Sequence, residues 1–346
     1  MTMERKRYRV AQWGTGHSGL RSLKAVIEHP LYDLVGVRVY SDAKTGKDAG
    51  ELCGLPPTGV IATNRIADII AAKPDCLMYF PATGMTSIDD ICAILGSGVN
   101  IVTLLSEFYY LPSLEPEVRR RIEAACQRGR SSLYATGPDP GFATSTLPLG
   151  ALSFQRRLDR VRLYEFANMA SRTAEMNRAM WGWEPSEDRF GAHAAAMRQG
   201  FGEAWRQTTA AIGLPLDDVT AEGGIALATT TVEIAAMTIE KGTVAGAQFD
   251  VTGWRNGQPL IQFCSTWWVT KHLDKDWALR DQDGWRLVVE GDTPLDISVA
   301  FASYDKVGNS SGYNAHICVN AVPNCCEARP GVLTPADMPP IVAQFA

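Results

Sequence analysis

The sequence predicts an α/β protein, in which a Rossmann-type, doubly wound parallel sheet is followed by an α+β domain. Three observations predict this class. A glycine loop at residues 14–19 joins a strand pattern to a helix pattern near the start of the chain. Strand and helix patterns then alternate as far as residues 131–136, which is typical of a parallel sheet with helices on both faces. Later strand patterns flank a mainly helical stretch at residues 174–213, which favours a mixed or antiparallel sheet.

The glycine loop has the spacing Gly-x-Gly-x-x-Gly in the context that dinucleotide binding requires. The strand "YRVAQW" precedes it, and a helical pattern follows from Leu20 to Ile27. The pyrophosphate is expected to approach the second glycine and to lie on the free N–H groups of the helix. The alternative is a glycine turn without a ligand, but both flanks fit the binding interpretation. The residues expected to hold the cofactor here are Gly14, Thr15, Gly16, His17, Ser18 and Gly19.

The end of the second strand bears on the choice between NADP and NAD. A ribose-binding Asp or Glu normally lies about 20 residues beyond the glycines. Here Asp42 comes slightly late, whereas Ser41 could donate to a 2′-phosphate and Lys44 and Lys47 could neutralise it. NADP is therefore preferred and NAD remains possible. The alternative is a solvated loop with ordinary charges.

In a parallel sheet, ligands bind beyond the carboxyl ends of the strands. The stretch "VTLLSEFYYLP" ends such a strand with Glu107 among aromatic residues. Neighbouring Leu, Phe and Tyr side chains should desolvate the carboxyl and raise its pKa. Glu107 either exchanges protons with a substrate or is an edge carboxylate that caps the next helix or pairs with an arginine. The other residues expected at this edge are Pro81, Ala82 and Thr83.

Beyond the alternating region, the Asn256-Gly257 pair between two alternating runs predicts a β-hairpin. We expect a sheet with helices on one face, whose other face could dimerise. Residues 1–145 are expected to form the NAD(P)-binding domain and residues 146–318 the substrate and dimerisation domain. A substrate pocket is expected at the domain boundary.

Composition excludes several functions. The net charge of −5 argues against nucleic-acid binding, and no stretch of 18 apolar residues would span a membrane. The start of the chain lacks a secretory apolar region, so a cytoplasmic location is expected. The eight cysteines are scattered without metal-ligand spacing, so we expect reduced thiols and no metal site.

Six segments together resemble one family. The segments are "GTGHSG", "VYSDAKTGKDAGELCG", "TLLSEFYYLP", "TGPDPGF", "YEFANMAS" and "VNAVPNCCEARPGVLTPADMP". They resemble the branch of dihydrodipicolinate-reductase-like proteins that contains 2,4-diaminopentanoate dehydrogenase and the native amine dehydrogenases. The resemblance implies a Rossmann domain, a substrate domain, a homodimer, and a C-terminal segment, residues 319–346, that returns to the first domain.

The resemblance also implies an activity. Members of the branch carry out NAD(P)-dependent reductive amination of small or medium hydrophobic aldehydes and ketones with ammonia, or the reverse oxidative deamination. It assigns the catalytic role to Glu107, and Asn320 in the last segment is a further candidate for contact with the cofactor. No counterpart of the paired-His and Lys signature of true dihydrodipicolinate reductases is present, so that activity is not expected.

The substrate side is less determined by the sequence. Arg172 stands where amine dehydrogenases tend to have an aromatic pocket residue, and it either admits a carboxylate or points to solvent. Asp139 and Phe108 depart from the Asn and the second acidic residue that the family often has. The alternatives are a reductase of another carbonyl, a cyclic imine or a diamino acid, and a non-catalytic dinucleotide-binding dimer. Candidates for an apolar substrate pocket are Phe142, Tyr164, Phe166, Met169, Trp181 and Trp267.

Overall fold

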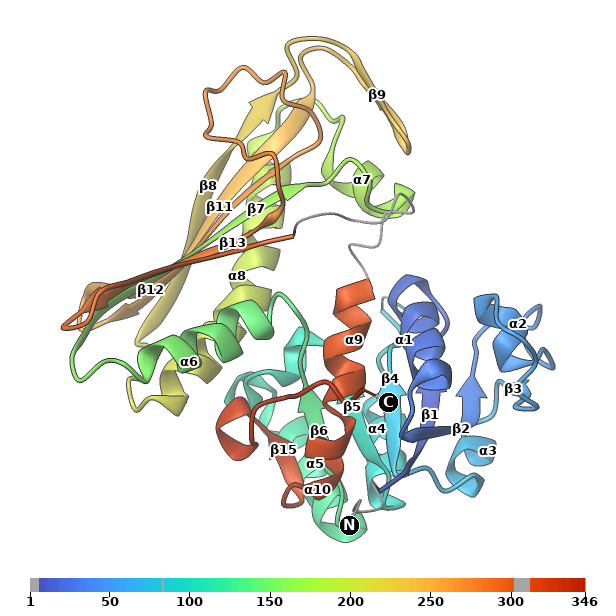
Figure 1. Cartoon of the computed structure of the whole chain (residues 1–346). Helices are drawn as coiled ribbons and strands as arrows, with labels where there is room; N and C mark the ends of the chain where they lie inside the picture. The colour runs from blue at the N-terminus through green and yellow to red at the C-terminus, as the bar shows by residue number, and fades with distance from the viewer. Residues whose placement is uncertain (1–5, 83, 302–311, 346) are drawn as a thin grey trace. The chain divides into compact units, whose positions relative to one another are not determined.

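A computed structural model describes residues 6–82, 84–301 and 312–345. The chain forms two compact units (Figure 1). Unit 1 comprises Met1–Phe142 and Ser311–Ala346, and unit 2 comprises Ala143–Ser310. The sequence placed the second boundary at residue 318. The helix α9 (Gly312–Asn320) instead belongs wholly to unit 1, because it packs beside α1 (His17–Glu28).

Unit 1 contains a seven-stranded sheet in which every strand pair is parallel. Its order is β15-β6-β5-β4-β1-β2-β3, so the direction of winding reverses between β1 and β4. This arrangement confirms the doubly wound sheet predicted from the alternating patterns. The strands are β1 (Tyr8–Trp13), β2 (Tyr32–Arg38), β3 (Ala62–Thr63), β4 (Cys76–Tyr79), β5 (Asn100–Thr103), β6 (Ser132–Ala135) and β15 (Gly331–Leu333).

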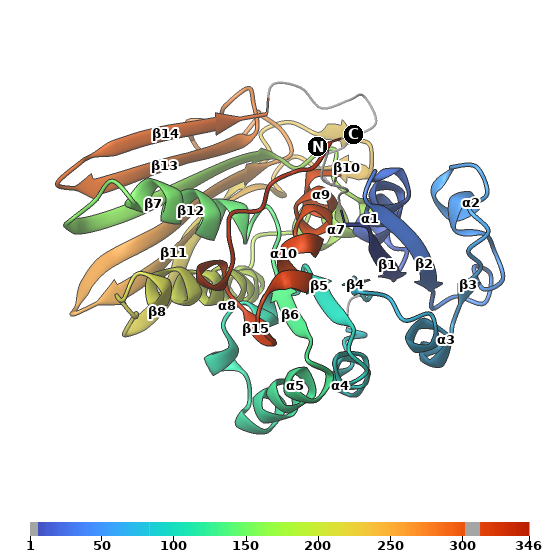
Figure 2. The ribbon, with the colours of Figure 1, turned by 60° about the horizontal axis from the view of Figure 1, so that its bottom comes forward.

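Helices cover both faces of this sheet (Figure 2). α1 and α9 lie on one face together with α10 (Val322–Glu327), and apolar side chains such as Val26 and Val319 pack there against Val10 and Met78. Right-handed crossovers put the helices between β4, β5 and β6 on the other face. The remaining helices are α2 (Ala49–Cys53), α3 (Ile66–Ala71), α4 (Ile88–Gly96), α5 (Pro116–Gly129), η1 (Ser106–Phe108), η2 (Leu111–Ser113) and η5 (Pro335–Asp337).

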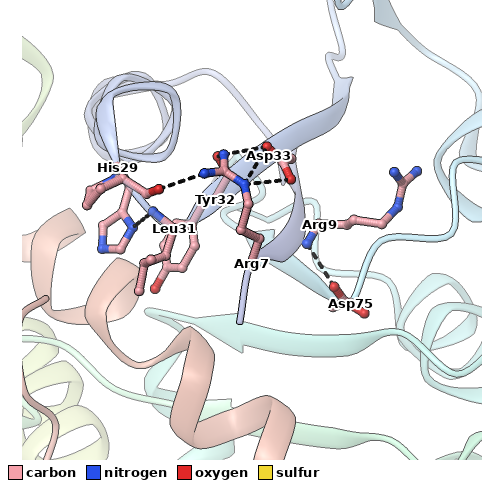
Figure 3. Close-up of polar contacts among 8 residues, drawn as sticks. Arg7, Arg9, His29, Leu31, Tyr32, Asp33 and Asp75 are labelled. Carbon is pink, nitrogen blue, oxygen red and sulfur yellow. Dashed lines mark hydrogen bonds and ion pairs between the residues drawn. The ribbon is translucent and has the colours of Figure 1, made fainter. Parts of the chain in front are cut away.

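Exposed polar contacts hold the amino edge of the sheet together (Figure 3). Arg7 pairs with Asp33 at 2.6 Å and donates to the Pro30 carbonyl at 2.9 Å. The backbone N–H of Arg9 donates to Asp75 at 2.8 Å. Exposed pairs of this kind contribute little to stability. The loops that follow β1, β4 and β5 lie at the opposite edge of the sheet, where these strands have their carboxyl ends.

Unit 2 contains a six-stranded mixed sheet with the order β14-β13-β7-β12-β11-β8. β7 and β12 are parallel, and the other neighbours are antiparallel. Asn256 and Gly257 join β11 to β12 with φ of 51° and 70°, which confirms the predicted hairpin with its primed turn. The strands are β7 (Leu158–Asn168), β8 (Asp218–Leu227), β11 (Val244–Arg255), β12 (Gln258–Trp268), β13 (Gly284–Gly291) and β14 (Leu295–Ala300).

The two faces of the unit 2 sheet differ. α8 (Glu187–Ala211) packs on one face, where Phe201 stacks on Phe263 with ring centroids 3.8 Å apart. On the other face polar side chains bond to each other, as in the 2.9 Å hydrogen bond that Gln262 donates to Thr252. The smaller elements of the unit are η3 (Phe142–Thr146), α6 (Leu147–Leu152), α7 (Ala174–Met180), β9 (Val232–Ile234) and β10 (Met237–Ile239).

Candidate functional site

The glycine loop lies at the carboxyl end of β1, and its three glycines have different surroundings. Gly14 has φ +85°, and a Cβ there would come within 2.0 Å of the Phe80 carbonyl oxygen. A Cβ on Gly19 would lie 2.3 Å from the Gly14 oxygen, whereas one on Gly16 would meet nothing within 4 Å. The first and third glycines thus allow close backbone packing, and the second faces open space. A pyrophosphate can approach the backbone at Gly16.

The N-terminus of α1 also suits an anion. Gly16 is its N-cap, no described side chain caps it, and its first turn holds no acidic residue. The 12-residue helix therefore directs free N–H groups and a positive dipole end at the loop. Lys44 adds a positive charge beside the loop, because its ammonium donates to the Thr15 carbonyl at 2.9 Å and to the Thr15 hydroxyl at 3.2 Å. The residues present fit a dinucleotide.

The end of β2 carries a cation that the sequence analysis missed. Arg38 pairs in register with Trp13, and its guanidinium carbon lies 4.3 Å from the Trp13 ring centroid and 4.1 Å from that of Tyr40. The Nε and Nη1 atoms of Arg38 are buried and have no hydrogen-bond partner within residues 6–82, 84–301 and 312–345. The available signal was an arginine and a tyrosine two residues apart at a strand end, on one face.

The other candidates for cofactor contact lie at several points of unit 1. Ser41 is exposed, and its hydroxyl accepts the Ala43 N–H at 3.2 Å. Pro81 is half-buried and Ala82 exposed, directly after β4, while Thr83 falls outside the described residues. Asn320 is half-buried at the end of α9.

Glu107 lies in η1, directly beyond β5 and at the same sheet edge as the glycine loop. Desolvation raises the pKa of its carboxyl, and a hydrogen bond with the Thr86 side chain acts in the lowering direction. The residue is nevertheless exposed, so the desolvation is partial. The expected rise of the pKa by desolvation is found. Of the aromatic residues that follow Glu107, Phe108 and Tyr109 are buried, and Tyr109 donates to the Pro140 carbonyl at 2.6 Å.

The alternative interpretation of Glu107 was a structural carboxylate that pairs with an arginine or caps the next helix. Glu107 makes no ion pair among the residues that the structure describes. It caps no described helix either, because Leu105 is the N-cap of η1, Tyr110 that of η2 and Glu115 that of α5. Neither structural role considered for this carboxylate is found in the described part of the chain.

The aromatic candidates of unit 2 do not form one group. Met169, Trp181 and Trp267 belong to one buried apolar cluster beneath α8, where Trp267 donates to Glu165 at 2.6 Å. Strand alternation places Tyr164 and Phe166 on the opposite face from Glu165, and Arg280 lies 4.1 Å above the Phe166 ring. The expectation that all of them line one pocket was therefore wrong. Only the register of β7 reveals this.

The last two candidates for substrate contact, Phe142 and Arg172, are both partly accessible. Phe142 is half-buried at the end of the first segment of unit 1. Arg172 is half-buried in the loop after β7, where its backbone N–H donates to the Met169 carbonyl at 2.9 Å.

All eight cysteines are free, and burial raises the pKa of the Cys126 thiol to about 12. In the described ranges no group of three His, Cys, Asp or Glu residues could hold a metal ion. None of the described helices has the length and apolar character to cross a membrane.

The fold and the glycine loop define the class: a two-unit α/β protein with a Rossmann-type dinucleotide fold. Comparisons show which known proteins the chain is similar to. Residues 189–346 match the 2,4-diaminopentanoate dehydrogenase C-terminal domain. An amine dehydrogenase from Streptomyces virginiae is 28% identical over 343 residues, which cover 94% of this chain and 95% of the relative. The C-terminal part of the chain is thus similar to a domain of 2,4-diaminopentanoate dehydrogenase, and nearly the whole chain is similar to an amine dehydrogenase.

Solved structures share the fold. The amine dehydrogenase from Mycobacterium smegmatis is 19% identical, with a TM-score of 0.77 and 97% of each chain covered. GenD2 from gentamicin A biosynthesis, solved in complex with NAD, is 15% identical with a TM-score of 0.51, and the match covers 92% of this chain and 87% of that chain.

Proposed function

We propose that this protein is an NAD(P)-dependent amine dehydrogenase. It carries out reductive amination of small or medium hydrophobic aldehydes and ketones with ammonia, and the reverse oxidative deamination. The observation that carries the proposal is Glu107, a carboxylate with a raised pKa and no ion pair among the described residues, at the sheet edge that holds the glycine loop. The names of the relatives support the same activity.

The cofactor is a nicotinamide dinucleotide, with NADP preferred and NAD possible. When bound, it supplies or accepts a hydride. The backbone of Gly14–Gly19 and the N-terminus of α1 hold the pyrophosphate, as the open space at Gly16 allows. Ser41, Pro81, Ala82, Thr83 and Asn320 are further contact candidates, and the complex of GenD2 with NAD supports the cofactor class.

Glu107 handles the protons. As a carboxylate it holds ammonium, accepts a proton from the attacking amine or water, and stabilises the cationic iminium of the substrate. Positioned acid–base groups contribute about 10² to 10⁴-fold in rate. A pKa above the ordinary value brings this carboxyl closer to the working pH, where proton transfer in both directions is efficient.

The substrate contacts follow from the buried cluster of unit 2 and its neighbours. Met169, Trp181 and Trp267 supply apolar surface for a hydrophobic carbonyl compound, with Phe142 and Arg172 as further candidates. Tyr164 and Phe166 are not part of this proposal. These two residues lie on the face of the sheet that α8 does not cover. We propose that the chain forms a homodimer through this face.

The remaining parts of the proposal concern organisation. Unit 1, residues 1–142 and 311–346, binds the cofactor, and unit 2, residues 143–310, binds the substrate and dimerises. The working compartment is the cytoplasm, with the carbonyl compound, the amine and ammonia as small-molecule partners and no nucleic acid.

The test measures oxidation of NADPH in the presence of ammonium and a panel of aldehydes and ketones. Glu107→Gln should lower kcat by about 10² to 10⁴-fold, because the amide cannot accept a proton. Its Kd for NADPH should stay near the wild-type value. Glu123→Gln is the matched control, since this carboxylate is exposed on α5 and pairs with Arg119 at 3.2 Å.

Three outcomes would contradict the proposal. Full activity of Glu107→Gln would remove Glu107 from the mechanism. Oxidation of NADPH that does not depend on ammonium would favour a reductase of another carbonyl or of a cyclic imine. Tight NADPH binding without turnover across the panel would favour a dinucleotide-binding dimer without catalysis.

A further inference from the structure

We propose that Arg38 binds the 2′-phosphate of NADP and is the residue that selects this cofactor over NAD. The inference rests on the proposed function only in assuming that the glycine loop holds a dinucleotide. Trp13 and Tyr40 act as positioning residues that hold the guanidinium between their rings.

The Arg38 guanidinium has no carboxylate partner among the described residues. Its Nε and Nη1 atoms are buried without a hydrogen-bond partner, and no ion pair of Arg38 occurs among the described residues. A half-buried cation with unsatisfied donors is costly unless an anion pairs with it. Arg7 and Arg121, also in unit 1, pair with Asp33 and Asp89 respectively. The missing anion of Arg38 is therefore expected to come from a ligand.

The position of Arg38 in unit 1 also fits a contact with the cofactor. Arg38 is the last residue of β2, and its carbonyl accepts the N–H of Gly14, the first glycine of the loop, at 2.9 Å. In dinucleotide-binding folds the end of this strand lies beside the adenosine ribose, whose 2′-position distinguishes NADP from NAD. Arginine presents its N–H groups as a planar fork that matches a phosphate in bidentate geometry.

The residues expected from the sequence to bind the 2′-phosphate already take part in other hydrogen bonds. The Lys44 ammonium donates to both the carbonyl and the hydroxyl of Thr15, so it supports the glycine loop. The Ser41 hydroxyl accepts the Ala43 N–H within a local turn. Lys44 thus keeps one N–H donor and Ser41 its hydroxyl proton, whereas the Nε and Nη1 donors of Arg38 are both unpaired in the described structure.

The aromatic side chains around Arg38 are held in place by contacts of their own. The Trp13 indole donates to the Tyr40 hydroxyl at 2.8 Å, and its ring lies 5.3 Å from that of Tyr79. The Tyr79 hydroxyl in turn accepts the Ser87 N–H at 3.2 Å, and burial raises the pKa of Tyr79 to about 12, so it stays neutral. A preorganised guanidinium loses little conformational entropy when it binds an anion.

The test is a binding measurement on the full chain by calorimetry, with 2′,5′-ADP, 5′-AMP and inorganic phosphate as ligands. The wild type should bind 2′,5′-ADP about 10 to 100-fold more tightly than 5′-AMP, as expected for hydrogen bonds to a charged group. Arg38→Leu should abolish this difference while keeping the affinity for 5′-AMP. Arg38→Lys should retain part of it, because the charge remains and the fork is lost.

Two controls separate charge and folding from recognition. Arg120→Leu removes one exposed arginine from α5 and should leave the preference for 2′,5′-ADP unchanged. Unchanged 5′-AMP binding shows that Arg38→Leu is folded. If Arg38→Leu no longer binds 5′-AMP, Arg38→Lys takes its place, and a smaller preference for 2′,5′-ADP than in the wild type then supports the inference, while an unchanged preference overturns it.

Equal affinity of the wild type for 2′,5′-ADP and 5′-AMP would overturn the inference, and so would an unchanged preference in Arg38→Leu. Inorganic phosphate that displaces 2′,5′-ADP at equal concentration would show a simple anion site and would also overturn it. Because no amine or carbonyl compound enters these measurements, their failure leaves the proposed amine chemistry untouched. A failure of that chemistry likewise leaves the binding result intact.

Discussion

At the scale of single residues, the carboxylate of Glu107 has no ion-pairing or helix-capping role among the described residues. It lies beyond β5 at the carboxyl edge, and within the described residues it makes no ion pair and caps no helix. Its pKa is raised from 4.5, mainly by desolvation. A group that makes no ion pair, caps no described helix and carries a perturbed pKa at a ligand-binding edge is a candidate for catalysis.

The raised pKa predicts how activity depends on pH. The reaction requires the carboxylate form, so kcat/KM should fall as the pH decreases through the pKa of Glu107. Because desolvation raises this pKa, the fall should begin at a higher pH than for an ordinary glutamate. The measurement is kcat/KM for one aldehyde with NADPH and ammonium across the acidic range. The residual activity of Glu107→Gln should not show this fall of kcat/KM at low pH. If the variant still shows the fall, another group than Glu107 causes it.

Single residues also mark the limit of sequence reasoning. Glu107 and the glycines were found because a strand pattern directly precedes each of them. Arg38 was missed because its role depends on stacking with Trp13, which lies on another strand. Tyr164 and Phe166 were grouped with Trp267 because the choice of face follows from the register between β7 and β12, which is a long-range property.

At the scale of elements, the strand–loop–helix unit of β1 and α1 separates two roles of glycine. A Cβ on Gly14 would lie 2.0 Å from a backbone oxygen, and a Cβ on Gly19 would lie 2.3 Å from one. Both glycines are therefore required by the close packing of the loop. Gly16 has an ordinary φ of −76° and open space around its missing Cβ. The same loop therefore contains positions that stabilise the fold and a position that admits a ligand.

Two alanine substitutions test this division. Gly14→Ala should destabilise unit 1 by at least about 1–2 kcal/mol, because a left-handed φ of +85° is strained for alanine and the methyl group meets the Phe80 oxygen. Gly16→Ala should leave Tm nearly unchanged and weaken NADPH binding, since the methyl group occupies the space of the pyrophosphate. Thermal unfolding and calorimetry measure the two effects. A large fall in Tm for Gly16→Ala, or its unchanged affinity, would contradict the division.

At the scale of the whole molecule, the chain leaves unit 1 after Phe142 and returns to it at Ser311. The returning segment adds β15 to β6 and packs α9 and α10 on the face that α1 also covers. Leu333 on β15 is 1% exposed and belongs to the same apolar cluster as Val10 and Val102. The C-terminal segment is therefore part of the core of unit 1.

This return predicts that the C-terminus supports the dinucleotide-binding unit. Leu333→Ala should lower the free energy of unfolding of unit 1 by about 2–5 kcal/mol, the usual cost of removing a buried leucine. Val342→Ala is the control, because Val342 is 64% exposed and should change little. Urea unfolding, followed in the presence and absence of NADPH, assigns the transition to unit 1. Equal stability of the two variants would show that β15 is dispensable.

The sequence alone determined the doubly wound sheet, the glycine loop, the hairpin at Asn256-Gly257 and the place of Glu107 after a strand. These features depend on short-range patterns, because strand and helix periods, turn residues and the spacing of glycines are read within a few residues. The tertiary structure decided the aromatic stacking of Arg38, the faces of Tyr164 and Trp267, the exposure of Glu107 and the membership of α9 in unit 1. Each of these depends on strand register and on packing between segments far apart in the chain, which no local pattern encodes.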